Sequence, residues 1–152
     1  MAGFNKFQVT VGDLGTKKLD LNGDTLVLIL TNTSPNAADV KYDTTTSPPQ
    51  LSSTSNAQEL ASSGGYTQAT SVGTHSYTQT SGTGTLSVSA NLVFTATSGF
   101  GPFRYATLCD TTAGTTATRS VIGWWDYGSS ISLLAGETLT WAPSGLNVLT
   151  LA

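Results

Sequence analysis

Alternation of apolar and hydroxyl side chains between residues 85 and 96 constrains the fold of this chain more than any other feature. One side of the segment is apolar and the other is mostly polar: Leu86, Val88, Ala90, Leu92, Phe94 and Ala96 face one way, whereas Ser87, Ser89, Asn91 and Thr95 face the other. A period of two places successive side chains on opposite faces of a strand. The segment therefore predicts a β-strand with one face in a core.

Further period-two runs recur along the chain between short turn signals. They predict strands over residues 7–11, 16–21, 24–30, 66–72, 75–80, 103–110, 120–127, 131–134, 137–141 and 146–151, and we expect the strands over 66–72 and 75–80 to form a hairpin. Asn22-Gly23 predicts a type I′ hairpin turn, and the run Leu26–Leu30, apolar on both faces, predicts a central strand covered on both sides. We expect residues 1–152 to form a single all-β domain, a β-sandwich or jelly roll of about eight to ten strands.

Three segments depart from this pattern. Residues 1–10 are a candidate for an extended N-terminal arm, and residues 31–55, rich in Asn, Ser, Thr and Pro, predict a long surface loop. The sequence Ser55-Asn56-Ala57-Gln58 has the form of a capping box, and a glycine stop follows at Gly64-Gly65. We therefore expect one short helix near residues 55–61.

Low charge excludes some classes of function. Only 10% of residues are charged, the net charge is −3, and the six basic residues are scattered, whereas binding through nucleic-acid phosphates needs a clustered basic face. Serine and threonine make up about three residues in ten. Such short hydroxyl side chains lose little conformational entropy when a surface docks, which suits a packed shell or a fibre.

Targeting and cysteine signals are sparse. The N-terminus has no signal-peptide pattern, and no apolar run approaches the roughly 18 residues that span a bilayer, so we expect a protein made in the cytosol, with no membrane partner. The single cysteine, Cys109, has no partner for an intrachain disulfide, and we expect it to be a small buried residue on a strand.

Candidate catalytic and metal-binding residues have simpler structural interpretations. His75 is the only histidine and no GxSxG elbow accompanies it, so we expect it to be an exposed strand residue. The segment Asp20–Asp24 has the carboxylate spacing of a calcium loop, but its glycine lies at the wrong position and no bidentate glutamate follows. We therefore expect no catalytic residue, no cofactor and no metal.

Aromatic residues supply the candidate interface. Alternation along Val121 to Tyr127 predicts that Trp125 lies in the core, which leaves Trp124 on the opposite face as an interface anchor or as part of a sugar site beside Asp126. The corner Phe100–Arg104 is either a subunit contact or a turn folded over the core. The candidate interface residues are Phe100, Phe103, Arg104 and Trp124.

The chain from Glu59 to its end resembles tailed-phage virion proteins of the head-decoration, or cement, type. The residues that carry the resemblance are Glu59-Leu60 with Gly64-Gly65-Tyr66, then Phe103-Arg104-Tyr105-Ala106-Thr107-Leu108, Val121-Ile122-Gly123-Trp124-Trp125-Asp126-Tyr127-Gly128, and Leu134-Ala135-Gly136-Glu137-Thr138-Leu139-Thr140-Trp141. The resemblance implies a jelly-roll-like subunit on the capsid exterior of the virion, commonly a trimer, that binds the major capsid protein lattice and strengthens it. The first 55 residues have no counterpart in it.

Two other functions remain open on the sequence. A receptor- or carbohydrate-binding module of a phage tail or fibre uses the same fold class, because fold does not decide function. Such a module needs several exposed aromatic residues in one groove, whereas a cement subunit needs them at a seam between subunits. An enzyme is a distant third, supported only by a two-carboxylate mechanism.

Overall fold

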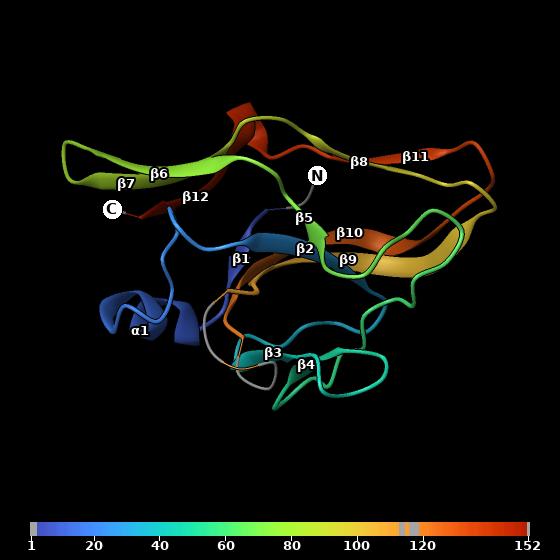
Figure 1. The fold of residues 1–152 in the computed structure, drawn as a ribbon, viewed down its shortest axis with the longest axis horizontal. Coiled ribbons are helices and arrows are strands. Elements are labelled where there is room, and N and C mark those ends of the chain that lie inside the picture. Colours follow the sequence, from blue (N-terminus) through green and yellow to red (C-terminus); the bar gives the residue numbers. More distant parts are fainter. Residues whose placement is uncertain (1–2, 113–114, 116–118, 152) are drawn as a thin grey trace.

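The computed structural model describes residues 3–112, 115 and 119–151, and these form an all-β fold of antiparallel sheets in stacked layers (Figure 1). This arrangement confirms the predicted sandwich-like fold class. Among the described residues, no helix has the length and apolar character needed to cross a membrane.

A five-stranded antiparallel sheet occupies the middle layer in Figure 1. Its strand order is β1 (Asn5–Lys6), β10 (Val121–Leu133), β9 (Phe100–Asp110), β2 (Leu26–Thr31) and β5 (Thr70–Ser71). Strand β9 contains the predicted strand 103–110, whereas β10 joins the two strands predicted over 120–127 and 131–134 into one. The short outer strands leave little free edge at either side of the sheet.

The upper layer in Figure 1 consists of two small sheets in line. One has the order β12 (Asn147–Leu151), β7 (Thr83–Val88) and β6 (His75–Thr80), and the other pairs β11 (Thr138–Trp141) with β8 (Leu92–Thr95). The chain runs from β7 into β8 and from β11 through the 3-10 turn Ser144–Leu146 into β12. The two sheets are therefore halves of one antiparallel ladder, interrupted at residues 89–91 and 142–146.

The main core lies between the upper and middle layers. It contains the inward side chains of both, including Leu28, Leu30, Leu86, Val88, Phe94, Phe103, Leu108, Trp125, Leu139, Trp141 and Leu149. The alternation that opened the sequence analysis is thus confirmed for Leu86, Val88, Phe94 and Ala96, which are all buried. The strand is broken at Ser89–Asn91, where Ala90 is exposed.

A third layer covers the other face of the middle sheet. It consists of the helix α1 (Val9–Gly15) and the hairpin β3 (Lys41–Asp43) with β4 (Gln50–Ser52), shown below the sheet in Figure 1. A second apolar cluster fills this side, made of Phe7, Val27, Ile29, Tyr42, Leu51, Ala57, Cys109 and Val121. The structure therefore confirms that β2 is covered on both faces and that Cys109 is a buried strand residue.

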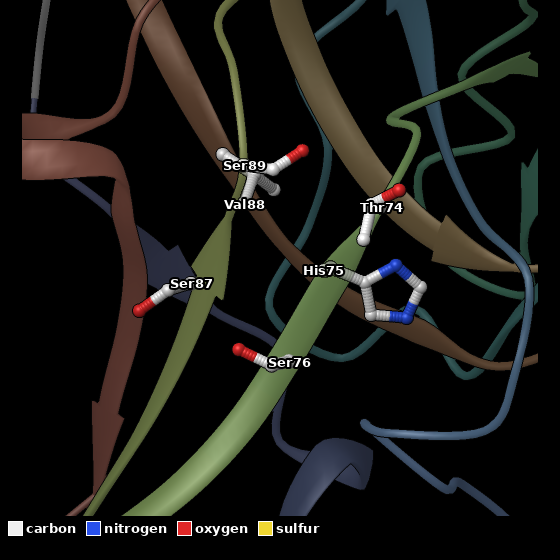
Figure 2. Close-up of a pocket in the computed structure, with 6 residues that line it drawn as sticks. All are labelled: Thr74, His75, Ser76, Ser87, Val88 and Ser89. Atoms are coloured by element: carbon white, nitrogen blue, oxygen red, sulfur yellow. The ribbon is translucent and has the colours of Figure 1, made fainter.

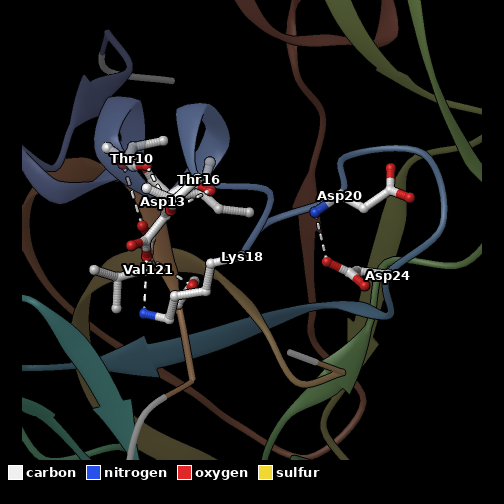
Figure 3. Close-up of polar contacts among 10 residues, drawn as sticks. Thr10, Asp13, Thr16, Lys18, Asp20, Asp24 and Val121 are labelled. Carbon is white, nitrogen blue, oxygen red and sulfur yellow. Dashed lines mark hydrogen bonds and ion pairs between the residues drawn. The ribbon is translucent and has the colours of Figure 1, made fainter. Parts of the chain in front are cut away.

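The predicted strand over residues 7–11 is wrong, because the chain forms α1 there. Thr10 Oγ1 donates to the carbonyl oxygens of Val121 and Ile122, beside a register shift in β10. Buried Asp13 accepts hydrogen bonds from Lys18 Nζ at 3.0 Å and from Ser120 Oγ at 2.7 Å (Figure 3). These polar contacts require Thr10 and Asp13 on one side of a helical turn, which a strand cannot provide.

The predicted helix near residues 55–61 is also wrong. Ser55 does not cap a helix, because its N–H and hydroxyl both donate to the carboxylate of buried Asp39. Gln58 then pairs with Gln50, and Glu59 pairs with Thr31. The segment is therefore extended and anchored to two neighbouring strands.

Residues 31–55 form more than the expected surface loop, since Tyr42 and Leu51 of the β3–β4 hairpin are both fully buried. Residues 3–10, the candidate arm, lie against the chain's own middle sheet: Asn5 and Lys6 pair with β10, and Phe7 is buried. Residues 31–55 and Phe7 contribute to the third layer, whereas Asn5 and Lys6 extend the middle sheet, and residues 1–2 of the candidate arm lie outside the described residues.

Two predicted hairpins differ in the structure. Residues 66–72 and 75–80 do not pair with each other, because Thr70–Ser71 pairs with β2 and His75–Thr80 pairs with β7. The true hairpin turns at Ser81-Gly82, where both residues have positive φ, 51° and 86°. At Asn22-Gly23 neither φ is positive, no strand covers residues 16–21, and the Asp24 N–H closes the turn onto the Asp20 carbonyl at 3.0 Å.

Candidate interaction surface

The outer face of the upper layer carries almost only hydroxyl side chains. Antiparallel register places directly opposed residues on the same face, and it pairs Ser76 with Ser87, Thr78 with Thr85 and Thr138 with Thr95. We call this surface the hydroxyl face; it consists of Ser76, Thr78, Thr80, Thr83, Thr85, Ser87, Val93, Thr95, Thr138, Thr140, Asn147 and Thr150. None of these residues is charged.

Burial of the alternate residues fixes which face points outward. Leu86 and Val88 on β7, and Phe94 on β8, are buried in the main core, so their neighbours along each strand must face solvent. Trp141 on β11 is fully buried, so its neighbours along that strand also face solvent. The orientation of the hydroxyl face therefore depends on the same alternation that the sequence shows.

Few hydroxyls on this face are engaged within the chain. Ser87 Oγ donates to Asn147 Oδ1 at 2.8 Å, and within the described residues no other hydroxyl of the face has a protein partner. Val93 is the one large apolar side chain there and is 52% exposed. Such a face can exchange its solvent hydrogen bonds for bonds to another protein, without removing a charge from water.

The edges of the middle sheet, by contrast, offer little room for another strand. The outer strands β1 and β5 of the middle sheet have two residues each, and short edge strands disfavour sheet extension. On β6, the Tyr77 N–H donates to Asn22 Oδ1 at 3.3 Å, so the turn before β2 caps part of that edge. At the middle sheet and at this part of β6, contacts through strand edges are therefore less favoured than contacts through the hydroxyl face.

The predicted interface residues do not form one exposed patch. Phe103 is fully buried and Phe100 is 6% exposed, and their rings pack 5.9 Å apart in the main core. Trp124 is half-buried, with its ring 4.6 Å from that of Phe7. For the corner at residues 100–104, which the sequence left open, the structure therefore has both phenylalanines folded into the core.

Arg104 differs from the other three because it reaches the surface. Its Nε and Nη2 atoms bind Asp126 Oδ1 and Oδ2 at 2.7 and 2.8 Å, in a bidentate ion pair across β9 and β10. These hydrogen bonds, with one from the Gly128 N–H, lower the pKa of Asp126 to about 2. Asp126 is therefore paired with Arg104 and is not a free carboxylate for a sugar site beside Trp124.

His75 begins β6 and is half-buried rather than exposed. Its Nδ1 donates to the Gly73 carbonyl oxygen at 3.0 Å, since a carbonyl oxygen can only accept. Figure 2 shows Ser76 and Ser87 pointing to the opposite side of the sheet from the imidazole ring. A hollow of about 110 Å³ lies here, and neither serine is placed to be activated by the imidazole.

Acidic residues of the predicted turn bind the main chain. Asp20 Oδ1 accepts the Asn22 N–H at 2.9 Å, and Asp24 Oδ2 accepts the Asp20 N–H at 2.6 Å, as Figure 3 shows for the second pair. Among the residues that the structure describes, no cluster of three or more His, Cys, Asp or Glu side chains could hold a metal ion.

A buried carboxylate is the main polar feature that the sequence analysis missed. Glu59 is 2% exposed and accepts hydrogen bonds from Tyr42 Oη at 2.5 Å, Tyr66 Oη at 2.6 Å and the Ala69 N–H at 2.8 Å. Burial raises the pKa of Glu59, partly offset by these three donors. The sequence contains one signal of this site, because Glu59 lies in a nearly uncharged stretch. The helix expected near residues 55–61 gave Glu59 a different explanation.

Comparison of the chain with models of protein families, with curated proteins and with solved structures finds no match in any of the three. Function must therefore be argued from the residues and their arrangement.

Proposed function

We propose that this protein is a non-enzymatic structural subunit of a virion, which decorates the assembled capsid from outside and stabilises it. The hydroxyl face is the surface that contacts the capsid lattice. The proposal rests on one observation above all, that a flat outer layer of paired strands presents hydroxyl groups without a single charge. Resemblance of residues 59 onward to head-decoration proteins supports the same function.

Energetics explain why such a face suits a decorating subunit. Each hydroxyl forms only a modest net hydrogen bond, of about 0.5–1.5 kcal/mol, so no single contact dominates. Repetition over a symmetric shell multiplies such modest contacts, because each subunit that binds also ties its neighbours together. We infer that copies of the protein associate with one another on the lattice, with a trimer as the favoured assembly.

A carbohydrate- or receptor-binding module is the alternative, and the aromatic residues argue against it. Trp125 and Trp141 are 3% and 0% exposed, and Trp124 packs on Phe7. A sugar site needs aromatic faces open to solvent, whereas all three tryptophans contribute to the two cores. The distribution of tryptophan therefore favours the structural function.

Placing a charge on the hydroxyl face tests the proposal. We expect Thr78→Arg combined with Thr140→Arg to weaken binding to capsids assembled without this protein by at least about thirtyfold, because an unpaired charge removed from water costs about 2 kcal/mol or more. Both threonines are exposed, so the fold should be unchanged. Binding is measured by cosedimentation of the labelled protein with the capsids over a concentration series.

Thr67→Arg is the matched control, since Thr67 is an equally exposed threonine on a loop outside the hydroxyl face. It should bind capsids as the unmodified protein does. Equal binding by the double variant and the control would refute the assignment of the hydroxyl face.

A further inference from the structure

The Asn22-Gly23 turn has no part in the hydroxyl face, yet it exposes an asparagine amide directly before a glycine. Both residues are exposed, and the turn is closed by the Asp24 N–H on the Asp20 carbonyl. Within the described residues, neither the Gly23 N–H nor the Asn22 side-chain amide nitrogen donates a hydrogen bond. The Asn22 side chain is held only through Oδ1, which accepts the Tyr77 N–H at 3.3 Å.

We propose that Asn22-Gly23 is a site of spontaneous deamidation, and that formation of isoaspartate there uncaps the edge of β6. The main-chain nitrogen of Gly23 gives its proton to solvent and attacks Asn22 Cγ. The side-chain amide nitrogen takes up a proton from solvent and leaves as ammonia as its bond to Cγ breaks, and the new bond closes a five-membered succinimide ring. Water then opens either ring carbonyl, which yields aspartate or isoaspartate.

Glycine at position 23 permits this reaction. A Cβ atom there would lie 2.7 Å from Asp20 Oδ2, so a larger residue would crowd the turn that the ring must pass through. Glycine also gives the main chain the conformational freedom that ring closure demands. The nucleophile and the leaving group therefore belong to adjacent exposed residues, and neither nitrogen donates a hydrogen bond within the described residues.

Conversion changes the contact that caps β6. In isoaspartate the main chain passes through the former side chain of residue 22 and is longer by one methylene group. The oxygen that accepts the Tyr77 N–H therefore changes position. The new carboxylate also lies beside Asp20 and Asp24, whose carboxylates already bind the main chain of this turn, and like charges repel. Among the described strands β6 pairs with β7 alone, so loss of the contact leaves an unpaired N–H on an edge strand, where further strands add to sheets.

Ageing the purified full-length chain at mildly alkaline pH, followed by peptide mapping with mass spectrometry, tests the reaction. The peptide that contains Asn22 should gain the mass difference between an amide and a carboxylic acid, and should separate into two isomers. Asn22→Gln, in which the competing ring has six members and closes slowly, should keep its mass. Retention of the Asn22 amide while other asparagines convert, or conversion at no position, would overturn the proposal.

Amide hydrogen exchange at Tyr77 tests the structural consequence separately. In the isoaspartate fraction, Tyr77 should exchange markedly faster than in fresh protein, whereas amides of β9 should exchange at the same rate in both. Unchanged protection of Tyr77 in converted protein would show that the edge stays capped and would reject that part of the proposal.

Discussion

Replacement of Glu59 by alanine is expected to lower the free energy of unfolding by about 3–5 kcal/mol. The carboxylate accepts three hydrogen bonds, from the buried hydroxyls of Tyr42 and Tyr66 and from the part-buried N–H of Ala69. Alanine would leave these donors without a partner, and unsatisfied buried groups are costly. Denaturation in urea, followed by tryptophan fluorescence, measures the loss.

Glu137→Ala is the matched control, because Glu137 is an exposed carboxylate that accepts only the Leu134 N–H. It should cause a far smaller loss. Equal losses for the two variants would mean that the buried hydrogen bonds of Glu59 contribute nothing specific.

The same residue predicts the direction of a pH effect. Burial raises the pKa of Glu59 above its ordinary value, so between the two values the folded protein holds a proton that the unfolded chain releases. The contribution of Glu59 to the free energy of unfolding is therefore fully present below its pKa in the unfolded chain, and it is lost as pH rises through its pKa in the folded protein. Glu59→Gln should remove that pH-dependent loss, and unfolding curves measured across the acidic range would reveal it.

Phe103→Ala should also lower the free energy of unfolding by about 3–5 kcal/mol, because its removal leaves a cavity in the main core. Phe103 is fully buried, and its ring contacts those of Phe100 and Tyr127 at centroid distances of 5.9 and 6.3 Å. The loss should be present in the isolated protein, measured by the same urea titration. Residue 103 would instead be an interface residue if alanine left the isolated protein stable and impaired assembly alone.

Val93→Ala gives the comparison for that experiment. Val93 is 52% exposed on the hydroxyl face, so its truncation should leave the stability of the isolated protein nearly unchanged. The two substitutions thus separate burial in the core from exposure on the proposed contact surface.

Local alternation predicted most of the strands correctly. The runs at β2, β7, β9 and β10 alternate, or are apolar throughout, over enough residues to specify both strand and face, and they supply most of the main core. Trp125 was assigned to the core from this pattern alone and is buried. Prediction succeeds for these segments because every second side chain lies in the same environment.

Segments shaped by distant partners were predicted wrongly. Alternation of Val9 and Val11 indicated a strand, but Thr10 and Asp13 bind residues more than a hundred positions away. The capping pattern at Ser55 fails for the same reason, since Asp39 takes the groups that would have capped the helix. Neither partner can be identified from nearby sequence, and tertiary contacts override local propensity.

The sequence alone predicts only part of the hydroxyl face. Outward residues of β7 and β8 followed from alternation, whereas the contributions of β6, β11 and β12 depend on pairing between strands far apart in the chain. Register decides that Thr78 lies beside Thr85 and that Thr140 lies beside Val93. An uncharged surface across five strands therefore emerges only from the folded arrangement.

Chemical labelling of single introduced cysteines tests the central claim most directly, because Cys109 is buried and its thiol has a raised pKa. Thr78→Cys and Thr140→Cys report on the hydroxyl face, and Thr67→Cys reports on the loop outside it. We predict that a maleimide labels all three variants in the free protein, but only the Thr67→Cys variant once the protein is bound to capsids. Equal labelling of all three on the capsids would contradict the account.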